Sequence, residues 1–331
     1  MASTDKGDLQ GYENEAYAGF AERVGEVVDI FNSQSNGAIT LEMDEVWGDR
    51  PDVAFFDYSK SSAARAIVDA TAKTYNKNTT DRARGFIKKY ANNRADNISD
   101  MKNQRIDMAT RARLNGIALA DDMMTDAINQ SLNAFYGAIS GISGLVNSDP
   151  ASGTAVTNTL TVQRLFTTKQ KMGDMHTKIA AWVMNSAGYF NLMKQMGATP
   201  GSATELAQGV MIDAQWNSVA GAPIVVTDNS VLEVAATSVA GAQNRVFGIV
   251  AGGVQSKVME GSPLTTFTDR TVTPNVDVTD IEYDIQTRVA GVDFSYGTAG
   301  DPALSVVASS TNWTKVATSV KNCAGVIGVF N

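Results

Sequence analysis

The sequence has one cysteine, Cys323, and one histidine, His176, among its 331 residues. A single cysteine excludes a disulfide within the chain and any cysteine-rich metal site. A single histidine excludes most zinc and two-metal sites and many catalytic triads. With no second histidine or cysteine to assist it, His176 is interpreted as a polar residue at an element boundary. Cys323 lies among apolar residues and is interpreted as a small buried hydrophobic residue.

Long apolar runs are also missing. No stretch approaches the ~18 consecutive apolar residues of a membrane span, and the longest apolar segments, 246–254 and 323–330, are short and contain glycine. The first residues, MASTDKGDLQGYENE, lack the basic start and apolar run of a signal peptide. We therefore expect a protein that is made in a cytoplasm and has no membrane partner.

Positive charge is scarce overall and unevenly placed. The net charge is −8 and the sequence pI is about 4.8, which disfavours a dedicated nucleic-acid binder but allows a protein that encloses DNA. Residues 1–57 hold three basic and thirteen acidic residues, whereas residues 58–113 hold thirteen basic and five acidic ones. The two segments form either two solvated surfaces or a contact between the acidic segment of one subunit and the basic segment of another.

Hydrophobic periodicity predicts two helices in the first half of the chain. Residues 13–31 place apolar side chains on one helical face; these are Tyr17, Phe20, Val24, Val27, Val28 and Phe31. A turn at Asn36-Gly37 and a strand over 38–46 should follow. Residues 81–113 are polar, basic and mostly helix-favouring. Residues 117–142 give the strongest helical pattern and should form a spine about 39 Å long.

The second half predicts a mixture of helices and strands. A boundary loop is expected at 147–158, helices at 162–172 and 185–196, and a strand at 178–181. Further strands are expected at 209–212, 224–227, 246–250, 271–276, 281–290 and 291–295.

Several residues invite a chemical interpretation, and each also has a structural one. Asp121, Asp122 and Asp126 fall in the early turns of the predicted spine, so we interpret them as partners of the helix dipole rather than as a cation site. The segment VAGGV at 250–254 lacks the glycine pattern and the Lys-Ser/Thr of a nucleotide loop. Trp182, Trp216 and Trp313 are interpreted as core or interface anchors. No catalytic, cofactor-binding or metal residue is assigned.

Three segments carry a resemblance to a known family. The sequence TKIAAWVMNSAGYFNL at 177–192 resembles the strand-then-helix element of HK97-fold capsid proteins, with Asn185 where histidine is commoner. The sequence GAPIVVTD at 221–228 is similar to the G-x-P-V-x-V-x-D strand that follows in those proteins. The sequence NWTKVATS at 312–319 resembles a segment near the end of one branch of phage major capsid proteins.

The resemblance implies an α+β, HK97-like capsid fold with four parts. The N-terminal arm would cover residues 1–36, and the extended E-loop would cover 58–102. The peripheral domain would combine 37–57, 103–150 and 271–305. The axial domain would combine 151–270 and 306–331.

The resemblance also implies a function. The chain would be a structural major capsid protein of the virion that assembles with copies of itself into hexamers and pentamers of an icosahedral shell around double-stranded DNA. Its other partners would be a portal protein and, where the phage uses them, scaffolding and decoration proteins. Because the expected N-terminal arm begins almost at Met1, we expect a separate scaffolding protein rather than a cleaved scaffolding domain. No lysine matches the family's crosslinking motif among those of the loop region: Lys60, Lys73, Lys77, Lys88, Lys89 and Lys102.

Two other functions remain open at this point. An encapsulin-like compartment shell would share the fold but hold cargo enzymes. An enzyme that uses carboxylates alone would need a pocket with paired Asp or Glu side chains of shifted pKa.

Overall fold

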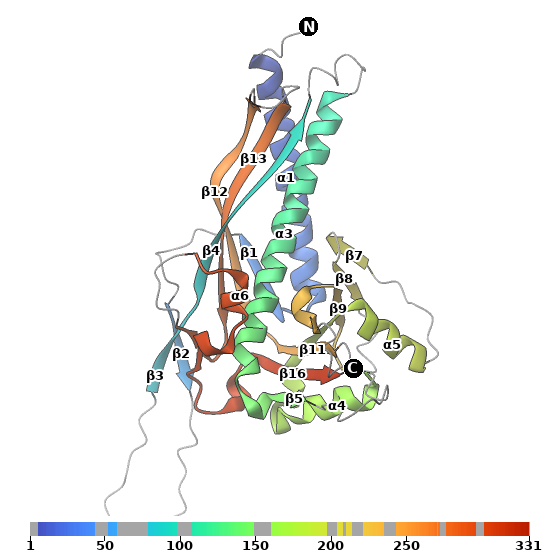
Figure 1. Cartoon of the computed structure of the whole chain (residues 1–331), viewed down its shortest axis with the longest axis vertical. Coiled ribbons are helices and arrows are strands. Elements are labelled where there is room, and N and C mark those ends of the chain that lie inside the picture. The colour runs from blue at the N-terminus through green and yellow to red at the C-terminus, as the bar shows by residue number, and fades with distance from the viewer. Residues whose placement is uncertain are drawn as a thin grey trace, which may run out of the picture.

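The computed structural model describes residues 6–43, 52–57, 79–97, 107–148, 160–196, 204–207, 210–213, 221–234, 243–269, 271, 276–295 and 301–330. The molecule is elongated, with a narrow arm joined to a broader base (Figure 1). Helix α1 (Lys6–Gln34) begins near the tip of the arm, whereas the last strand, β16 (Gly325–Phe330), lies in the base.

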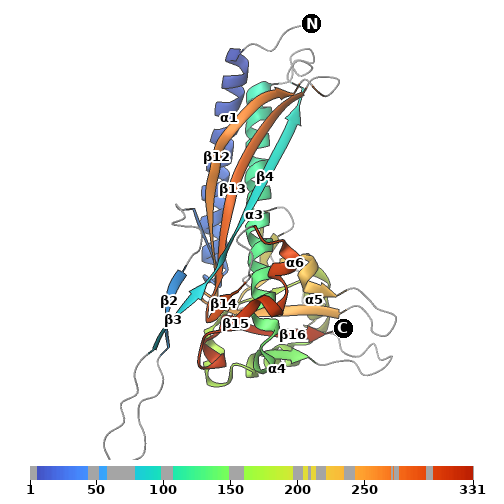
Figure 2. The same ribbon diagram turned by 60° about the vertical axis from the view of Figure 1, so that its left-hand side comes forward.

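Two long helices run side by side along the arm (Figure 2). Helix α1 packs along α3 (Met108–Ser140), and the two point in the same direction. Glycine makes their close approach possible. A Cβ atom at Gly19 or at Gly116 would collide with the backbone of the other helix. The acidic N-terminal segment is therefore packed against the spine of its own chain.

Both helices differ in detail from their predictions. Helix α1 is longer than 13–31, and its buried stripe excludes Tyr17, which is 46% exposed. The stripe consists of Tyr12, Ala16, Phe20, Val24, Val27 and Phe31. Helix α3 begins at Met108 rather than at 117 because Asp107 caps it, accepting a hydrogen bond from the backbone N–H of Ala109 at 3.3 Å. It ends at Ser140 rather than at 142.

A four-stranded sheet, here called the arm sheet, lies against these helices. Its order is β1-β12-β13-β4, with β1 parallel to β12 and the other pairs antiparallel. The strands are β1 (Ile39–Met43), β12 (Val254–Asp269), β13 (Val276–Val289) and β4 (Phe86–Asp96). Alternate residues of β13, including Ile281, Tyr283 and Ile285, are fully buried on the face toward α3.

The prediction of a helix-favouring run over 81–113 was wrong for its first half. Residues 79–84 form β3 and residues 86–96 form β4. Because β4 is the edge strand and keeps one face in solvent, polar side chains dilute its alternating pattern. Strand β12 was missed because its pattern is broken around Pro263, where the pairing register shifts twice. Proline in a sheet is confined to edges and such bulges.

Two strands of the arm sheet come from segments that were expected to belong to other parts of the fold. Residues 254–269 were expected with the axial segment 151–270, and residues 86–96 with the E-loop segment 58–102. Both instead pair with β13 in the arm sheet. Pairing between strands so far apart in sequence cannot be inferred from local composition.

A hairpin projects from the side of the molecule (Figure 1). Strand β2 (Asp52–Asp57) pairs antiparallel with β3 (Thr79–Arg84) in a separate two-stranded sheet. The backbone N–H of Arg84 donates to the carboxylate of Asp293 at 2.8 Å, which anchors the base of the hairpin to β14 (Val292–Phe294).

The base is built around an eight-stranded sheet, here called the base sheet. Its order is β5-β16-β11-β6-β9-β8-β7, with β10 also paired to β11. The remaining strands are β5 (Val146–Ser148), β6 (Ile179–Met184), β7 (Thr204–Ala207), β8 (Val210–Asp213), β9 (Ile224–Thr227), β10 (Glu233–Val234) and β11 (Gln243–Val250). Helices α4 (Val162–Gln170) and α5 (Ser186–Met196) pack on this part.

Most predicted elements of the second half are confirmed. The predicted strand 224–227 coincides with β9, and the predicted helices 162–172 and 185–196 correspond to α4 and α5. The predicted strands 281–290 and 291–295 correspond to β13 and β14, whereas most of 271–276 lies outside the described residues. Among the described helices, none is long and apolar enough to cross a membrane.

Candidate functional site

A polar layer joins α3 to the inner face of the arm sheet. Tyr283 of β13 donates its hydroxyl to the Asp126 carboxylate at 2.7 Å, and the Asn92 amide donates to the Tyr283 hydroxyl at 2.6 Å. The Tyr90 ring stacks on Tyr283 with centroids 5.5 Å apart, and its hydroxyl donates to Gln130 at 3.0 Å. Burial raises the pKa of Asp126 above its ordinary value, against the opposing effect of these hydrogen bonds. The layer fixes helix and sheet in one register.

The three aspartates of the spine face three different partners. Asp121 accepts a hydrogen bond from Arg23 of α1 at 2.8 Å, Asp122 pairs with Arg94 of β4 at 2.5 Å, and Asp126 accepts from Tyr283. Because α3 begins at Met108, none of them lies in its first turn, so the interpretation as helix-dipole partners was wrong. Within the described ranges, no group of three His, Cys, Asp or Glu side chains could hold a metal ion.

Part of the complementary charge of the first two segments pairs inside one subunit. Glu22 of α1 forms an ion pair with Arg113 of α3, whereas Glu42 pairs with Lys257, outside the basic segment, at 3.0 Å. Such exposed pairs contribute little stability. The Glu22–Arg113 pair shows that the acidic segment contacts the end of the basic segment within its own chain.

The single histidine, the single cysteine and two of the tryptophans singled out in the sequence occupy structural positions. His176 is exposed in a short 3₁₀ turn, and its Nδ1 lies 2.9 Å from the carbonyl oxygen of Gly173, which confirms the boundary interpretation. Cys323, Trp182 and Trp313 are buried, whereas Trp216 lies outside the described residues.

The segment 250–254 joins the two sheets. It forms the turn from β11 to β12, where Gly252 adopts a φ of 65° and donates its N–H to the Gly37 carbonyl at 2.7 Å. The Gly253 carbonyl accepts from the N–H of Ala290 at 2.9 Å. A Cβ at Gly253 would lie 2.6 Å from the Ala324 carbonyl oxygen. The glycines therefore serve a tight backbone junction.

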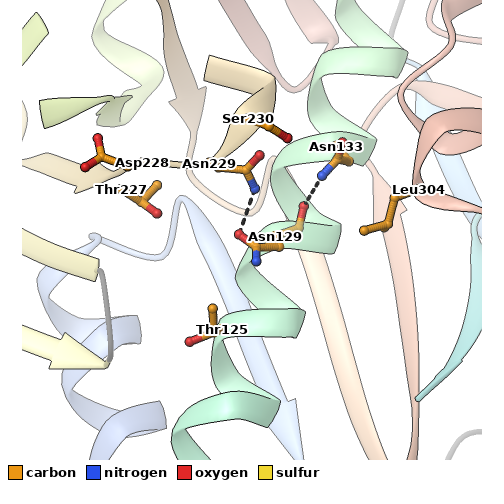
Figure 3. A pocket seen from close by; sticks show the side chains of 8 residues that line it. All are labelled: Thr125, Asn129, Asn133, Thr227, Asp228, Asn229, Ser230 and Leu304. Carbon is orange, nitrogen blue, oxygen red and sulfur yellow. Dashed lines mark hydrogen bonds between the residues drawn. The ribbon is translucent and has the colours of Figure 1, made fainter. Parts of the chain in front are cut away.

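A polar pocket of about 310 Å³ lies between α3 and the turn after β9 (Figure 3). Asn129, Asn133 and Asn229 form its centre, and the Asn229 amide donates to Asn129 Oδ1 at 2.7 Å. The remaining lining residues are Thr125, Thr227, Asp228, Ser230 and Leu304. Asp228 is the one carboxylate among the described residues of this lining, so these residues do not offer the carboxylate pair that a hydrolytic site needs.

Large apolar side chains are exposed on both parts of the molecule. In the described ranges six of them are more than 40% exposed: Tyr17, Met43, Leu114, Phe166, Phe190 and Phe267. Phe267 lies on the arm sheet, whereas Phe166 and Phe190 lie on α4 and α5 in the base. Single exposed apolar side chains on separate elements are normal on folded proteins and do not by themselves mark a contact surface.

The family-like segments meet in space. Strands β6 and β9 are parallel neighbours, with Trp182 beside Ile224. Asp228, which closes the second segment, accepts the backbone N–H of Ser186 in the first at 2.8 Å. Asn185, the departure from histidine, accepts the N–H of Gly188 at 2.9 Å and so caps α5 as expected.

The third segment closes the junction of arm and base. Trp313 donates its indole N–H to the Val307 carbonyl at 2.7 Å, and its ring packs against Phe294 with centroids 4.9 Å apart and against Phe86 at 6.1 Å. A Cβ at Gly137 of α3 would touch both Trp313 and Val307. The first two segments therefore pack on each other in the base, and the third packs on α3.

Comparison with known proteins decides the family. The major capsid protein 13-like family (Gp13-like) matches residues 8–327, nearly the whole chain. The chain belongs to this family. It is therefore a structural capsid protein of a bacteriophage and a component of the virion. The compartment-shell and enzyme alternatives are not favoured.

The chain is also similar to solved phage capsid structures. The capsid protein of cyanophage Pam1 matches with a TM-score of 0.50 and 12% identity over 88% of each chain. The capsid protein of Ralstonia phage GP4 matches with a TM-score of 0.49 and 10% identity, covering 78% of this chain and 84% of that one. The comparison with curated proteins gave no significant match. The capsid protein has the HK97-like fold.

Sequence reasoning missed the polar layer. Asn92 and Tyr90 lie on β4, which was expected to be helical. The alternation of Phe86, Lys88 and Tyr90 was the available signal, and it was outweighed by the polar residues between them.

Proposed function

We propose that copies of this capsid protein form hexamers and pentamers of a closed icosahedral shell around double-stranded DNA. A portal protein would occupy one vertex, and scaffolding or decoration proteins would assist where the phage encodes them. The chain would do this without a catalytic centre or cofactor. Membership of a major capsid protein family over residues 8–327 is the observation that carries the proposal.

The shape of the subunit supports this role. The hairpin β2–β3 extends away from the body and pairs only with itself among the described strands. A two-stranded hairpin is marginally stable alone. Repeated contacts in a closed symmetric assembly would support it from a neighbouring subunit.

The strand pairings support an amended division of the chain. The peripheral domain would consist of α3 and the arm sheet, including β12 and β4. The axial domain would consist of the base sheet with α4 and α5. The E-loop would be the β2–β3 hairpin with residues 58–78, and α1 would be the N-terminal arm.

Expression of the chain alone and with its neighbouring genes tests the proposal. Negative-stain microscopy and light scattering should show closed particles tens of nanometres wide, or rings of subunits. Nuclease-protected DNA inside particles from infected cells would distinguish a phage head from a cargo compartment. A subunit that stays monomeric near 35 kDa under both conditions would contradict the proposal.

A further inference from the structure

Strand β4 is one edge of the arm sheet, with β13 on one side and no strand on the other among the described residues. Its eleven residues pair with β13 without any register shift. In such an antiparallel pair, successive residues direct their backbone N–H and C=O groups alternately toward the partner strand and away from it.

One hydrogen bond shows which residues point away. The backbone N–H of Lys89 donates to the Asp301 carboxylate at 3.4 Å, so it does not face β13. The same alternation turns the backbone groups of Ala91, Asn93 and Ala95 to the open edge. Among the described residues, Asp301 contacts the backbone of this edge at Lys89 and also pairs with the Lys88 side chain at 3.1 Å.

Proteins guard exposed edges with lysine, proline, bulges or inward-pointing charge. The open stretch has no lysine, no proline and no bulge. Here the three outward residues are alanine, asparagine and alanine, and all three are exposed. Inward-pointing charge is present at Arg94 and Asp96, but both side chains already pair within the subunit, with Asp122 and Arg111 of α3. Small side chains leave the backbone accessible to another chain.

We propose that the edge formed by Ala91, Asn93 and Ala95 accepts an extended segment of a second copy of this chain by strand addition. The inference rests on the proposed function, because a second copy of the chain is available to cover this edge only if the protein assembles with itself. An unpaired edge without outward charge is an aggregation hazard in a monomer, and a shell subunit is spared that hazard when a neighbour covers it. The short stretch limits the contact to a few backbone hydrogen bonds, which suits a contact repeated throughout a shell.

Hydrogen exchange compares the edge in free subunits and in assembled shells. In free subunits the amides of Ala91, Asn93 and Ala95 should exchange fast, while those of Asn92 and Arg94 should be protected by β13. In shells all five should be protected. Shells in which the three outward amides still exchange at the free rate would overturn the inference while leaving the proposed function intact. Failure of the wild type to form shells would overturn both.

A proline substitution tests the same edge by function. Asn93→Pro removes an N–H that does not bond to β13, so the subunit should keep its fold and a melting temperature close to that of wild type. The yield of closed shells should fall at least roughly tenfold, as expected when a backbone contact is lost at every subunit. The matched variant Asn93→Ser retains the N–H and should assemble normally. Equal shell yields for the proline and serine variants would contradict the inference; if the proline variant misfolds, the exchange experiment on wild type decides.

Discussion

The hydroxyl of Tyr283 donates a hydrogen bond to the carboxylate of Asp126 at 2.7 Å, linking the central strand β13 to the spine helix α3. The same carboxylate oxygen lies 3.5 Å from the Asn92 amide of β4, so helix and two strands meet at one atom. Burying a carboxylate costs free energy, which these two donors offset only in part. Specific packing of the arm is thus obtained at some expense of stability.

Asp126→Asn should stabilise the subunit at neutral and higher pH. The raised pKa means that the folded protein favours protonated Asp126, so this group's contribution to stability is greatest at low pH and is lost as the pH rises through the folded-state pKa. Thermal melts from pH 4 to 8 should show a higher melting temperature for the variant at pH 8 and a shrinking difference as the pH falls. Asp121→Asn, which breaks the pair with Arg23, should lower stability slightly at pH 8. A lower melting temperature of Asp126→Asn at every pH would refute this account.

Gly116→Ala should weaken the packing of α1 on α3. The new methyl group would collide with the carbonyl of Ala16, and overpacking of this kind costs about 1–3 kcal/mol. Gly25→Ala in α1 meets no atom within 4 Å and should instead stabilise the helix by roughly 0.5–1 kcal/mol. Chemical denaturation of both variants measures these opposite changes in the free energy of unfolding. Equal changes in the free energy of unfolding for the two substitutions would show that α1 and α3 do not pack closely at Gly116.

Trp313→Phe should destabilise the junction of arm and base. The variant loses the indole hydrogen bond to Val307 and leaves a buried carbonyl unpaired, at a cost of about 1–3 kcal/mol. Phe166→Leu, on an exposed position of α4, is the control and should change the unfolding free energy by less than about 0.5 kcal/mol. Indistinguishable denaturation midpoints for the two variants would argue against a buried anchor at Trp313.

Asn185→Ala should loosen the start of α5. The side chain caps Gly188 and also donates to Asn244 at 2.6 Å, so its loss should cost about 1 kcal/mol. Asn185→Asp keeps the cap acceptor and loses only the donor, and it should recover part of that stability. Melting temperatures give the comparison. An alanine variant as stable as wild type would mean that the residue replacing the family's commoner histidine has no capping role.

The sequence predicted the base better than the arm. The base strands are short, buried and apolar, so β6, β9 and β11 are visible in local patterns. The arm depends on pairings between distant segments and on exposed strands whose composition is polar. Strand β4 therefore looked helical, and β12 was hidden by the interruption at Pro263. The family was visible because its three segments form local strand-and-turn patterns around buried residues such as Trp182, Ile224 and Trp313.

The partners of the spine aspartates could not be predicted from sequence. Their positions on α3 were known, but each contacts a different element, and Arg23, Arg94 and Tyr283 are separated from them by 28 to 157 positions. A cluster of like charges in a sequence therefore gave no information on whether the charges converge or diverge in the fold.

The most direct test of the central claim is the mass of the assembled protein. Analytical ultracentrifugation of the purified chain, followed by electron microscopy of the fastest fraction, should reveal rings of five or six subunits and closed shells. A single species near 35 kDa across the accessible concentration range, with and without the neighbouring gene products, would contradict the assignment of this chain as a self-assembling shell subunit.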